Sequence, residues 1–168
     1  WTNTMMDLKG EGGIVFSTKT LRDVHLIKLA WIIPLFTIIA AVLIHVLAGN
    51  VRDVPFFISE ADHPGLERVV FTSGLFVSAC FQCLLSIRLF FLLKEKARPR
   101  ILLFATILGV LSSTHLAVLA FADMYDHISL HIYTSMVVFH GGFCWAFLTH
   151  FALPNPHPKG KKLRLLSL

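Results

Sequence analysis

Residues 69–93 read VVFTSGLFVSACFQCLLSIRLFFLL, an apolar run interrupted by a single charge, Arg88. The hydrocarbon core of a bilayer is about 30 Å thick and needs about 20 apolar residues in a helix. Three further runs reach that length, at residues 26–49, 101–121 and 129–153. Lipid admits only helices or closed barrels, and these continuous runs do not alternate as barrel strands do. The sequence therefore predicts an all-α fold, a polytopic transmembrane helical bundle with four spans.

The composition agrees with a membrane protein. The 168 residues are 55% hydrophobic and 15% charged, with a mean hydropathy of +0.72. Soluble domains have about 45–50% apolar and about 25% charged residues. Disordered chains and most soluble enzymes are excluded on this ground. The net charge is +5, but the basic residues form blocks between apolar runs, which favours an orientation signal and no nucleic-acid partner.

Charge differs between the connections and predicts an orientation. Loops 50–68 and 122–128 each sum to −2, whereas residues 94–100 sum to +3 and the tail 154–168 to +4. Lys and Arg concentrate on the cytoplasmic side of short loops. We therefore expect both termini to be cytoplasmic and the two acidic loops to be lumenal or extracellular. The expected location is an endomembrane, such as that of the endoplasmic reticulum, Golgi or lysosome, or the plasma membrane.

Three regions follow from these assignments. Residues 1–25 form a cytoplasmic N-terminal segment, and residues 26–153 form the four-span bundle. Residues 154–168 are strongly basic and end in LRLLSL. Two interpretations of this tail stay open: a short basic tail lying on the membrane, or the start of a further span in a five- or six-span protein.

Small residues spaced four apart occur in two spans, as Gly74 with Ser78 and Gly109 with Ser113. Such pairs let helix backbones approach closely in lipid. We expect them to mediate packing between the second and third spans.

The cations on the predicted cytoplasmic side form a candidate surface for anionic lipid. Each adds about 1 kcal/mol of attraction near an anionic membrane. The positive-inside rule alone explains their presence, and specific phosphoinositide binding is an additional hypothesis. Arg88 lies inside the second span and is expected to extend toward the headgroups. The full set is Arg88, Lys94, Lys96, Arg98, Arg100, Lys159, Lys161, Lys162 and Arg164.

Acidic and histidine side chains gather on the predicted lumenal side. Glu60 and Glu67 lie in the first acidic loop, and we expect them to anchor it by pairing with Arg68 or a histidine of the fourth span. Asp126, His127 and His131 lie at the start of that span. Carboxylates with imidazoles suit either a solvated polar cap or a metal or proton-linked site. Metal binding is left open.

The nine histidines raise the alternative of a haem held by two ligands from different helices. His115 and His140 differ in predicted depth by ~7 Å at about 1.5 Å per residue, which fits poorly. His45 and His131 both lie near the predicted lumenal surface and fit better. The simpler interpretation is neutral histidine hydrogen-bonded between helices, so no cofactor is expected.

Residues 55–71, PFFISEADHPGLERVVF, resemble a motif of the Frag/DRAM/Sfk membrane-protein family. The Pro-Pro of that motif is replaced here by Gly65-Leu66. At the head of the fourth span, where the family often has a histidine followed by an acid, Ile132 stands in place of the acid. The positions in register are Ile58, Ser59, Glu60, Glu67, Phe71, His131 and Phe139.

The resemblance implies a protein of five or six spans with a non-catalytic role in lipid homeostasis. Relatives in that family include autophagy modulators of lysosomal membranes, organisers of a phosphatidylinositol 4-kinase complex and a factor in GPI-lipid remodelling. Taken with the residues, it leads us to expect a membrane scaffold or regulator that acts with lipids, anionic ones among them, and with a larger protein complex.

Two other functions remain as alternative hypotheses. One is a haem- or quinone-associated anchor subunit of a membrane oxidoreductase, motivated by the histidines and the four spans. The other is a lipid-modifying enzyme that uses the lumenal histidines and carboxylates. The chain shows no recognisable nucleophile, base and oxyanion set, so we predict no catalysis.

Overall fold

The computed structural model describes residues 12–16, 19–51 and 57–153, and four long helices dominate it. Each of the four is long and apolar enough to cross a membrane, which confirms the predicted all-α bundle. The helices are α1 Asp23–Leu47, α2 Leu66–Leu93, α3 Pro99–Leu119 and α4 Ile128–Ala152. The remaining elements are the strands β1 Gly13–Phe16 and β2 Lys19–Arg22 and a single 3₁₀ turn, η1, Ile58–Ala61.

The helix boundaries differ from the predicted spans by a few residues. The helices α1 and α2 each begin three residues before the apolar run that predicted them, because Asp23 and Glu67 are tolerated in a first helical turn. The antiparallel β1–β2 hairpin and η1 were not predicted. Each of these elements has four residues, which is too short for a periodic pattern of apolar residues to show in the sequence. The tail 154–168 lies outside the described residues, so neither interpretation of it is decided.

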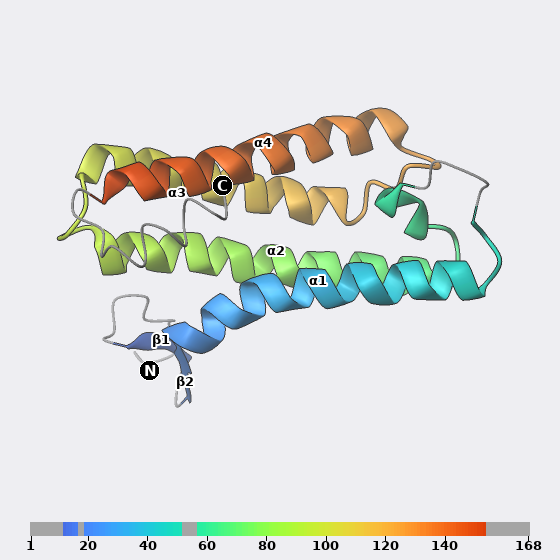
Figure 1. Cartoon of the computed structure of the whole chain (residues 1–168), viewed down its shortest axis with the longest axis horizontal. Coiled ribbons are helices and arrows are strands. Elements are labelled where there is room, and N and C mark those ends of the chain that lie inside the picture. Colours follow the sequence, from blue (N-terminus) through green and yellow to red (C-terminus); the bar gives the residue numbers. More distant parts are fainter. Residues whose placement is uncertain (1–11, 17–18, 52–56, 154–168) are drawn as a thin grey trace, which may run out of the picture.

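The helices pack in chain order, with α1 on α2, α2 on α3 and α3 on α4 (Figure 1). Each neighbouring pair is antiparallel, as in other up-and-down bundles; the connections after α2 and α3 are short, whereas the one after α1 is longer and contains η1. Within the part of the chain that the structure describes, α1 and α4 show no packing comparable to that of these three pairs. The bundle is therefore open along the side between its first and last helices.

The buried core lies toward the end of the bundle that carries η1. Ala41 of α1, Phe71 and Leu75 of α2, and Leu116 and Leu119 of α3 form its centre. Large apolar side chains also cover the outside of the bundle, including some that are more than 60% exposed, such as Phe36, Phe104 and Phe139. Such a surface is typical of helices that face lipid.

The two predicted small-residue pairs bring different helices together. A Cβ on Gly74 would overlap Thr37, so Gly74 packs on α1, and the expectation that it faces the third span is wrong. A Cβ on Gly109 would lie 2.5 Å from Ser86 Oγ on α2 and 2.8 Å from Trp145 Cδ1 on α4. Gly109 therefore packs against α2, as expected for contact between the second and third spans. Its lack of a side chain also leaves room for Trp145 of α4.

We predict that Gly74→Ala destabilises the bundle by about 1–3 kcal/mol, because the new methyl must displace the stiff, β-branched Thr37. Gly142→Ala is the matched control, since a Cβ there meets its nearest neighbour at an ordinary 3.6 Å. Unfolding midpoints in mild detergent compare the two variants. Equal midpoints would mean that α1 and α2 do not approach closely at Gly74.

Arg88 is buried and ion-paired, and the expectation that it extends to the headgroups is wrong. Its side chain is 2% exposed. Its Nε donates to Asp23 Oδ1 at 2.7 Å and its Nη2 donates to Asp23 Oδ2 at 3.2 Å. This two-pronged pair joins the first residue of α1 to the last turns of α2. A paired, hydrogen-bonded guanidinium is the form in which a buried arginine is tolerated.

Asp23→Ala is predicted to lower stability by about 2–5 kcal/mol, because it leaves the buried Arg88 charge without its carboxylate. Adding Arg88→Met should restore part of the loss, since an apolar side chain needs no counter-charge. The measurement is the unfolding midpoint in detergent. Asp126→Ala, at a side chain that is 67% exposed, is the control. A loss no greater than that of the control would contradict the role given to the pair.

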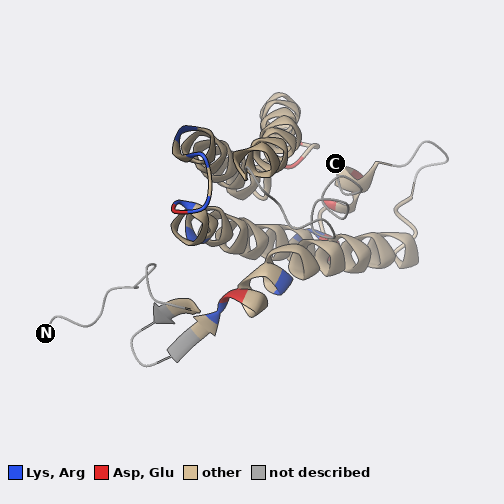
Figure 2. Cartoon of the chain, turned by 60° about the vertical axis from the view of Figure 1, so that its left-hand side comes forward, with Lys and Arg blue, Asp and Glu red and all other residues tan. Residues whose placement is uncertain are grey.

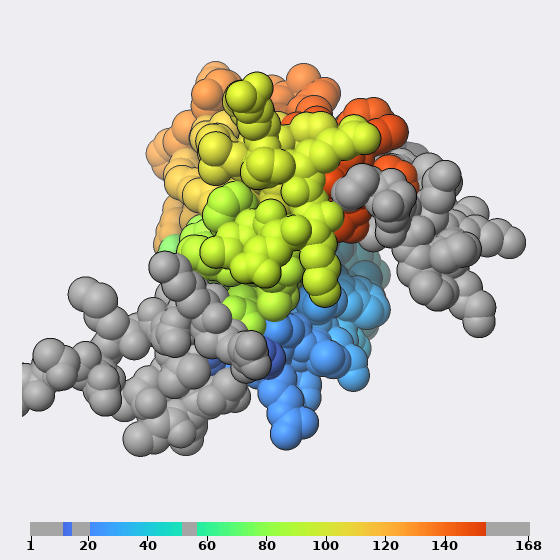
Figure 3. Space-filling view, turned by 90° about the vertical axis from the view of Figure 1, so that its left-hand side faces the viewer, coloured from blue at the N-terminus to red at the C-terminus, as the bar shows by residue number. Residues whose placement is uncertain are grey.

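The two ends of the bundle carry opposite charge (Figure 2). The turn between α2 and α3 bears exposed cations and forms the middle of one end face, beside the start of α1 and the end of α4 (Figure 3). The backbone N–H of Arg98 donates to the Ala152 carbonyl at 2.7 Å and attaches this turn to α4. The exposed cations are Lys94, Lys96, Arg98 and Arg100, whereas Lys159, Lys161, Lys162 and Arg164 lie outside the described residues.

Candidate functional site: a polar cap and a lateral groove

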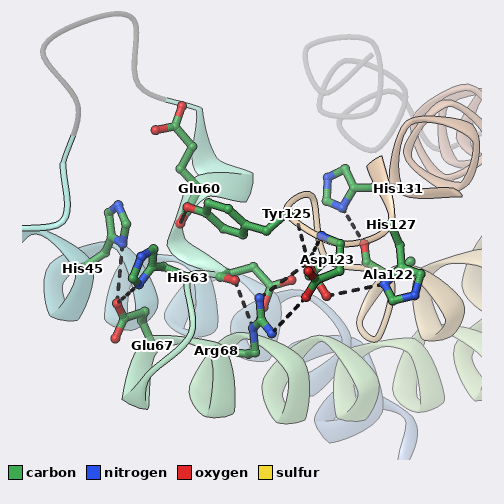
Figure 4. Close-up of polar contacts among 12 residues, drawn as sticks. His45, Glu60, His63, Glu67, Arg68, Ala122, Asp123, Tyr125, His127 and His131 are labelled. Carbon is green, nitrogen blue, oxygen red and sulfur yellow. Dashed lines mark hydrogen bonds and ion pairs between the residues drawn. The ribbon is translucent and has the colours of Figure 1, made fainter. Parts of the chain in front are cut away.

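Two loops meet at the acidic end of the bundle and form what we call the polar cap, residues 57–68 and 120–131 (Figure 4). The first segment contains η1 and the start of α2, and the second joins α3 to α4. All but one of the residues predicted for a lumenal site lie here, and Phe71 follows one turn further along α2. The structure thus brings the two predicted clusters together at one end of the bundle.

Glu67 connects the end of α1 to the start of α2. Its side chain is 3% exposed, and its Oε1 accepts a hydrogen bond of 2.8 Å from Asn50 Nδ2. The Nδ1 atoms of His45 and His63 lie 3.6 Å and 3.5 Å from the same oxygen. For Glu67 the expected pairing with Arg68 or a histidine of the fourth span is therefore wrong. The histidines it contacts precede it in the chain.

Glu60 stabilises η1 and contacts the α3–α4 loop. Its Oε1 accepts from the backbone N–H of Phe57 at 3.1 Å, which caps the 3₁₀ turn. The Glu60 carbonyl accepts from Tyr125 Oη at 3.0 Å, so the segment before α4 is held against η1. Glu60 thus anchors η1 through its side chain and its backbone, by contacts with Phe57 and Tyr125, whereas the predicted partners were Arg68 or a histidine of the fourth span.

Arg68 is the cation that the acidic side chains of both loops share. Its Nε donates to the Asp62 carbonyl at 3.2 Å and lies 3.7 Å from Asp62 Oδ1. Its Nη2 lies 3.5 Å from Asp123 Oδ1, and its Nη1 lies 3.9 Å from Asp126 Oδ2. One guanidinium therefore holds η1 and the α3–α4 loop together, a function that the sequence did not assign to it.

Asp123 organises the α3–α4 loop. Its Oδ1 accepts the backbone N–H groups of Tyr125 at 2.9 Å and Asp126 at 2.7 Å, and its Oδ2 lies 3.6 Å from His127 Nδ1. Burial raises the pKa of Asp123, but these two N–H groups and the Arg68 charge outweigh it and hold the pKa below its usual value. Asp123 is therefore ionised, and it stabilises the turn by accepting these two backbone hydrogen bonds.

For Asp62 the balance is reversed, because the effect of burial on its pKa outweighs that of the nearby Arg68 charge. It is 1% exposed, and among the described residues neither carboxylate oxygen accepts a hydrogen bond. Burial raises the pKa of Asp62 from 3.8 to about 7, which Arg68 opposes and the nearby Asp123 reinforces. The cap therefore contains one carboxyl group that titrates near neutral pH.

This titration predicts how stability depends on pH. The folded protein keeps the Asp62 proton up to about pH 7, whereas the unfolded chain loses it near 3.8, so the folded state binds more protons in between. The stability contributed by Asp62 is therefore complete below 3.8 and is lost as the pH rises through about 7. Asp62→Asn should remove this fall and unfold at a higher temperature than the wild type at pH 8.

Unfolding midpoints in detergent at pH 5 and pH 8 test this, with Asp126→Asn as the exposed control. The wild type and the control should both lose stability between the two pH values, and Asp62→Asn should lose less. An equal fall of the unfolding midpoint between pH 5 and pH 8 in all three proteins would show that Asp62 is already ionised at the lower pH.

His131 connects the start of α4 to the preceding loop. Its Nδ1–H donates to the Ala122 carbonyl at 2.7 Å. In Figure 4 it lies on the other side of the cap from His45, and the two histidines have different partners. His115 and His140 each donate Nδ1–H to the carbonyl four residues earlier, at 2.9 Å and 2.8 Å. His131 is thus attached to the preceding loop, whereas His115 and His140 bond their own helices, so the predicted hydrogen bonds between helices are wrong for these histidines. Nowhere in the described ranges do three His, Cys, Asp or Glu side chains gather closely enough to hold a metal ion.

A cavity of about 600 Å³ lies beneath the cap, on the open side between α1 and α4. A second cavity of about 340 Å³ continues toward the basic end and shares Gln82 and Val138 with the first. We call the two together the lateral groove. Its walls are α1 and α4 and its floor is α2 and α3. The wider cavity is lined by five residues of the predicted motif positions, Ile58, Ser59, Phe71, His131 and Phe139.

Sequence reasoning missed several polar residues of the groove. Gln82 Nε2 donates to the Ala30 carbonyl at 3.4 Å across the floor, and Ser112 Oγ donates to the Val138 carbonyl at 2.9 Å. Ser135 lines the wider cavity one turn after His131. The available signal was the presence of Gln and Ser inside otherwise apolar spans, where polar groups must find partners.

The fold and the site define the class of this protein. It is a bundle of four helices, each long and apolar enough to cross a membrane, with a polar cap at one end and a groove along one side. Comparisons with protein-family models, with curated proteins and with solved structures found no match. The cap and the groove are thus the features that bear on its function.

Proposed function

We propose that this protein is an integral membrane protein that holds a membrane lipid in its lateral groove. In this role it acts as a non-catalytic scaffold or regulator in lipid homeostasis. The observation that carries the proposal is the groove itself, which lies between α1 and α4 along the apolar length of the bundle. Lipid is the solvent on that side, so its acyl chains meet the groove without leaving the bilayer.

The shape and chemistry of the groove suit an acyl chain. Its wider part has a volume of about 600 Å³, within the range of about 300–1,000 Å³ that is typical of small-molecule sites. From the cap it continues past Gln82 to Ile27 and Trp31, in the opposite half of α1. A long, narrow and mostly apolar channel of this kind fits an extended chain better than a compact ligand.

The resemblance to the Frag/DRAM/Sfk family supports a role with lipids. The residues in register come from two distant parts of the sequence, and five of them line one cavity. We propose membership of that family, an orientation with both termini cytoplasmic, and residence in an endomembrane or the plasma membrane. Anionic lipid then meets the exposed cations of the α2–α3 turn, and a larger protein complex is the proposed partner.

Filling the groove tests the proposal. Val138→Trp places an indole where the two cavities join, and the protein purified in mild detergent should lose most of its retained lipid in native mass spectrometry. Ile132→Trp is the matched control, because Ile132 lies on the same helix, is 55% exposed and lines neither cavity. The control should retain lipid as the wild type does.

Three results would contradict the proposal. The wild type could carry no lipid, or both tryptophan variants could carry equal amounts. Alternatively, Val138→Trp could release a co-purifying membrane protein while lipid stays bound, which would assign the groove to a partner helix. An absorption spectrum of the same sample tests the oxidoreductase alternative, since a Soret band that scales with protein would favour a haem-bearing subunit.

A further inference from the structure

We propose that the cap end of the lateral groove recognises the free hydroxyl group of an uncharged, diacylglycerol-type lipid through His131, Ser59 and Ser135. This inference rests on the proposed function, because it names the class of lipid that the groove takes. The three side chains come from η1 and α4 and line the same cavity. In each of them, a hydrogen-bonding atom has no partner among the described residues.

His131 presents an acceptor to the groove. Its Nδ1–H is already donated to the Ala122 carbonyl, so in the neutral ring Nε2 has a lone pair and no proton. The Nδ1 bond is the single side-chain hydrogen bond that His131 makes to a described residue, which leaves Nε2 without a partner there, and the residue as a whole is 7% exposed. An acceptor in a mostly apolar cavity is satisfied only by a donor, and here the ligand must bring it.

Two hydroxyl groups accompany this acceptor. Ser135 follows His131 by four residues and therefore lies on the same face of α4, while Ser59 enters from η1. Neither hydroxyl has a partner among the described residues, whereas Thr134 and Ser78 bond their own helix backbones. A hydroxyl group both donates and accepts, so the three side chains together complete the bonding of one alcohol.

Charge excludes an ionic headgroup at this position. Of the described residues that line the wider cavity, none is Lys, Arg, Asp or Glu. The nearby Glu60 carboxylate is engaged with the backbone N–H of Phe57. Among these described lining residues a phosphate finds no cation to neutralise it, and an ammonium finds no anion. An uncharged alcohol meets neither difficulty.

The groove also distinguishes between uncharged alcohols. Beyond Gln82 it continues as the second cavity, which has the smaller volume and is bordered by Gly109, Gly142 and Trp145. A flexible acyl chain can follow this course along the bundle, whereas a rigid fused-ring sterol would fill only the wider part. A glycerol backbone with a free hydroxyl at the cap and an acyl chain along the groove fits both halves.

The experiment compares two lipids that differ at the hydroxyl alone. The full chain is placed in nanodiscs of dioleoylphosphatidylcholine that contain equal minor amounts of 1,2-dioleoylglycerol and its 3-acetyl ester. Lipid retained by the protein is then counted by native mass spectrometry. One hydrogen bond to a buried partner predicts that the wild type enriches the free alcohol about tenfold over the ester.

Two variants make the test specific to the site. His131→Asn keeps an N–H for the Ala122 carbonyl but removes the acceptor at Nε2, and Ser135→Ala removes a hydroxyl group that has no structural partner. Each should reduce the enrichment severalfold while total dioleoyl lipid in the groove stays constant. Ser73→Ala is the control, because Ser73 bonds its own helix and does not line the groove. It should behave as the wild type does.

The outcomes separate this inference from the proposed function. Retention of lipid without preference for the free alcohol would overturn the inference and leave the lipid-binding function intact. Failure of the wild type to retain lipid at all would overturn both. Cholesterol, added in a parallel arm, should not displace dioleoylglycerol, and displacement would overturn the assignment to a diacylglycerol-type lipid.

Discussion

The Arg68 guanidinium, shared among Asp62, Asp123 and Asp126, is the interaction on which the acidic end of the structure depends. Two acidic loops meet there, and the cation between them offsets the repulsion of their carboxylates. With these loops joined, η1 and the first turn of α4 are placed above the same cavity. The positions of Ser59 and His131 at the head of the groove follow from that contact.

Sequence patterns predicted the scaffold better than they predicted the contacts. Span length and hydropathy identified four helices within a few residues, because the bilayer sets both quantities. Pairing partners were harder to predict. Glu67 contacts His45 of α1 instead of Arg68, and Arg88 pairs with Asp23, far away in the chain. The length and apolar character of each span were readable from the sequence, but helix rotation and crossing, which decide which polar groups meet, were not.

A polar connection at each end also explains why the bundle can remain open along one side. The Arg88–Asp23 pair attaches the start of α1 to α2 at the basic end, and the Glu67 contacts attach the end of α1 to α2 at the other. Between them Gly74 allows close packing on Thr37. Because α1 is secured along α2 in this way, it needs no comparable packing against α4. The groove between α1 and α4 is then compatible with a stable fold.

Partnered and unpartnered polar groups are distributed unevenly along the groove, and this argues that it is a binding site and not a packing defect. In its middle, Gln82, Ser86 and Ser112 each donate a hydrogen bond to a backbone carbonyl, so each of these polar side chains is attached to a helix backbone. At the cap end, three groups without hydrogen-bond partners among the described residues, on Ser59, His131 and Ser135, line one cavity. A ligand that matches this pattern is polar at one end and apolar along the rest, which is the chemistry of a membrane lipid.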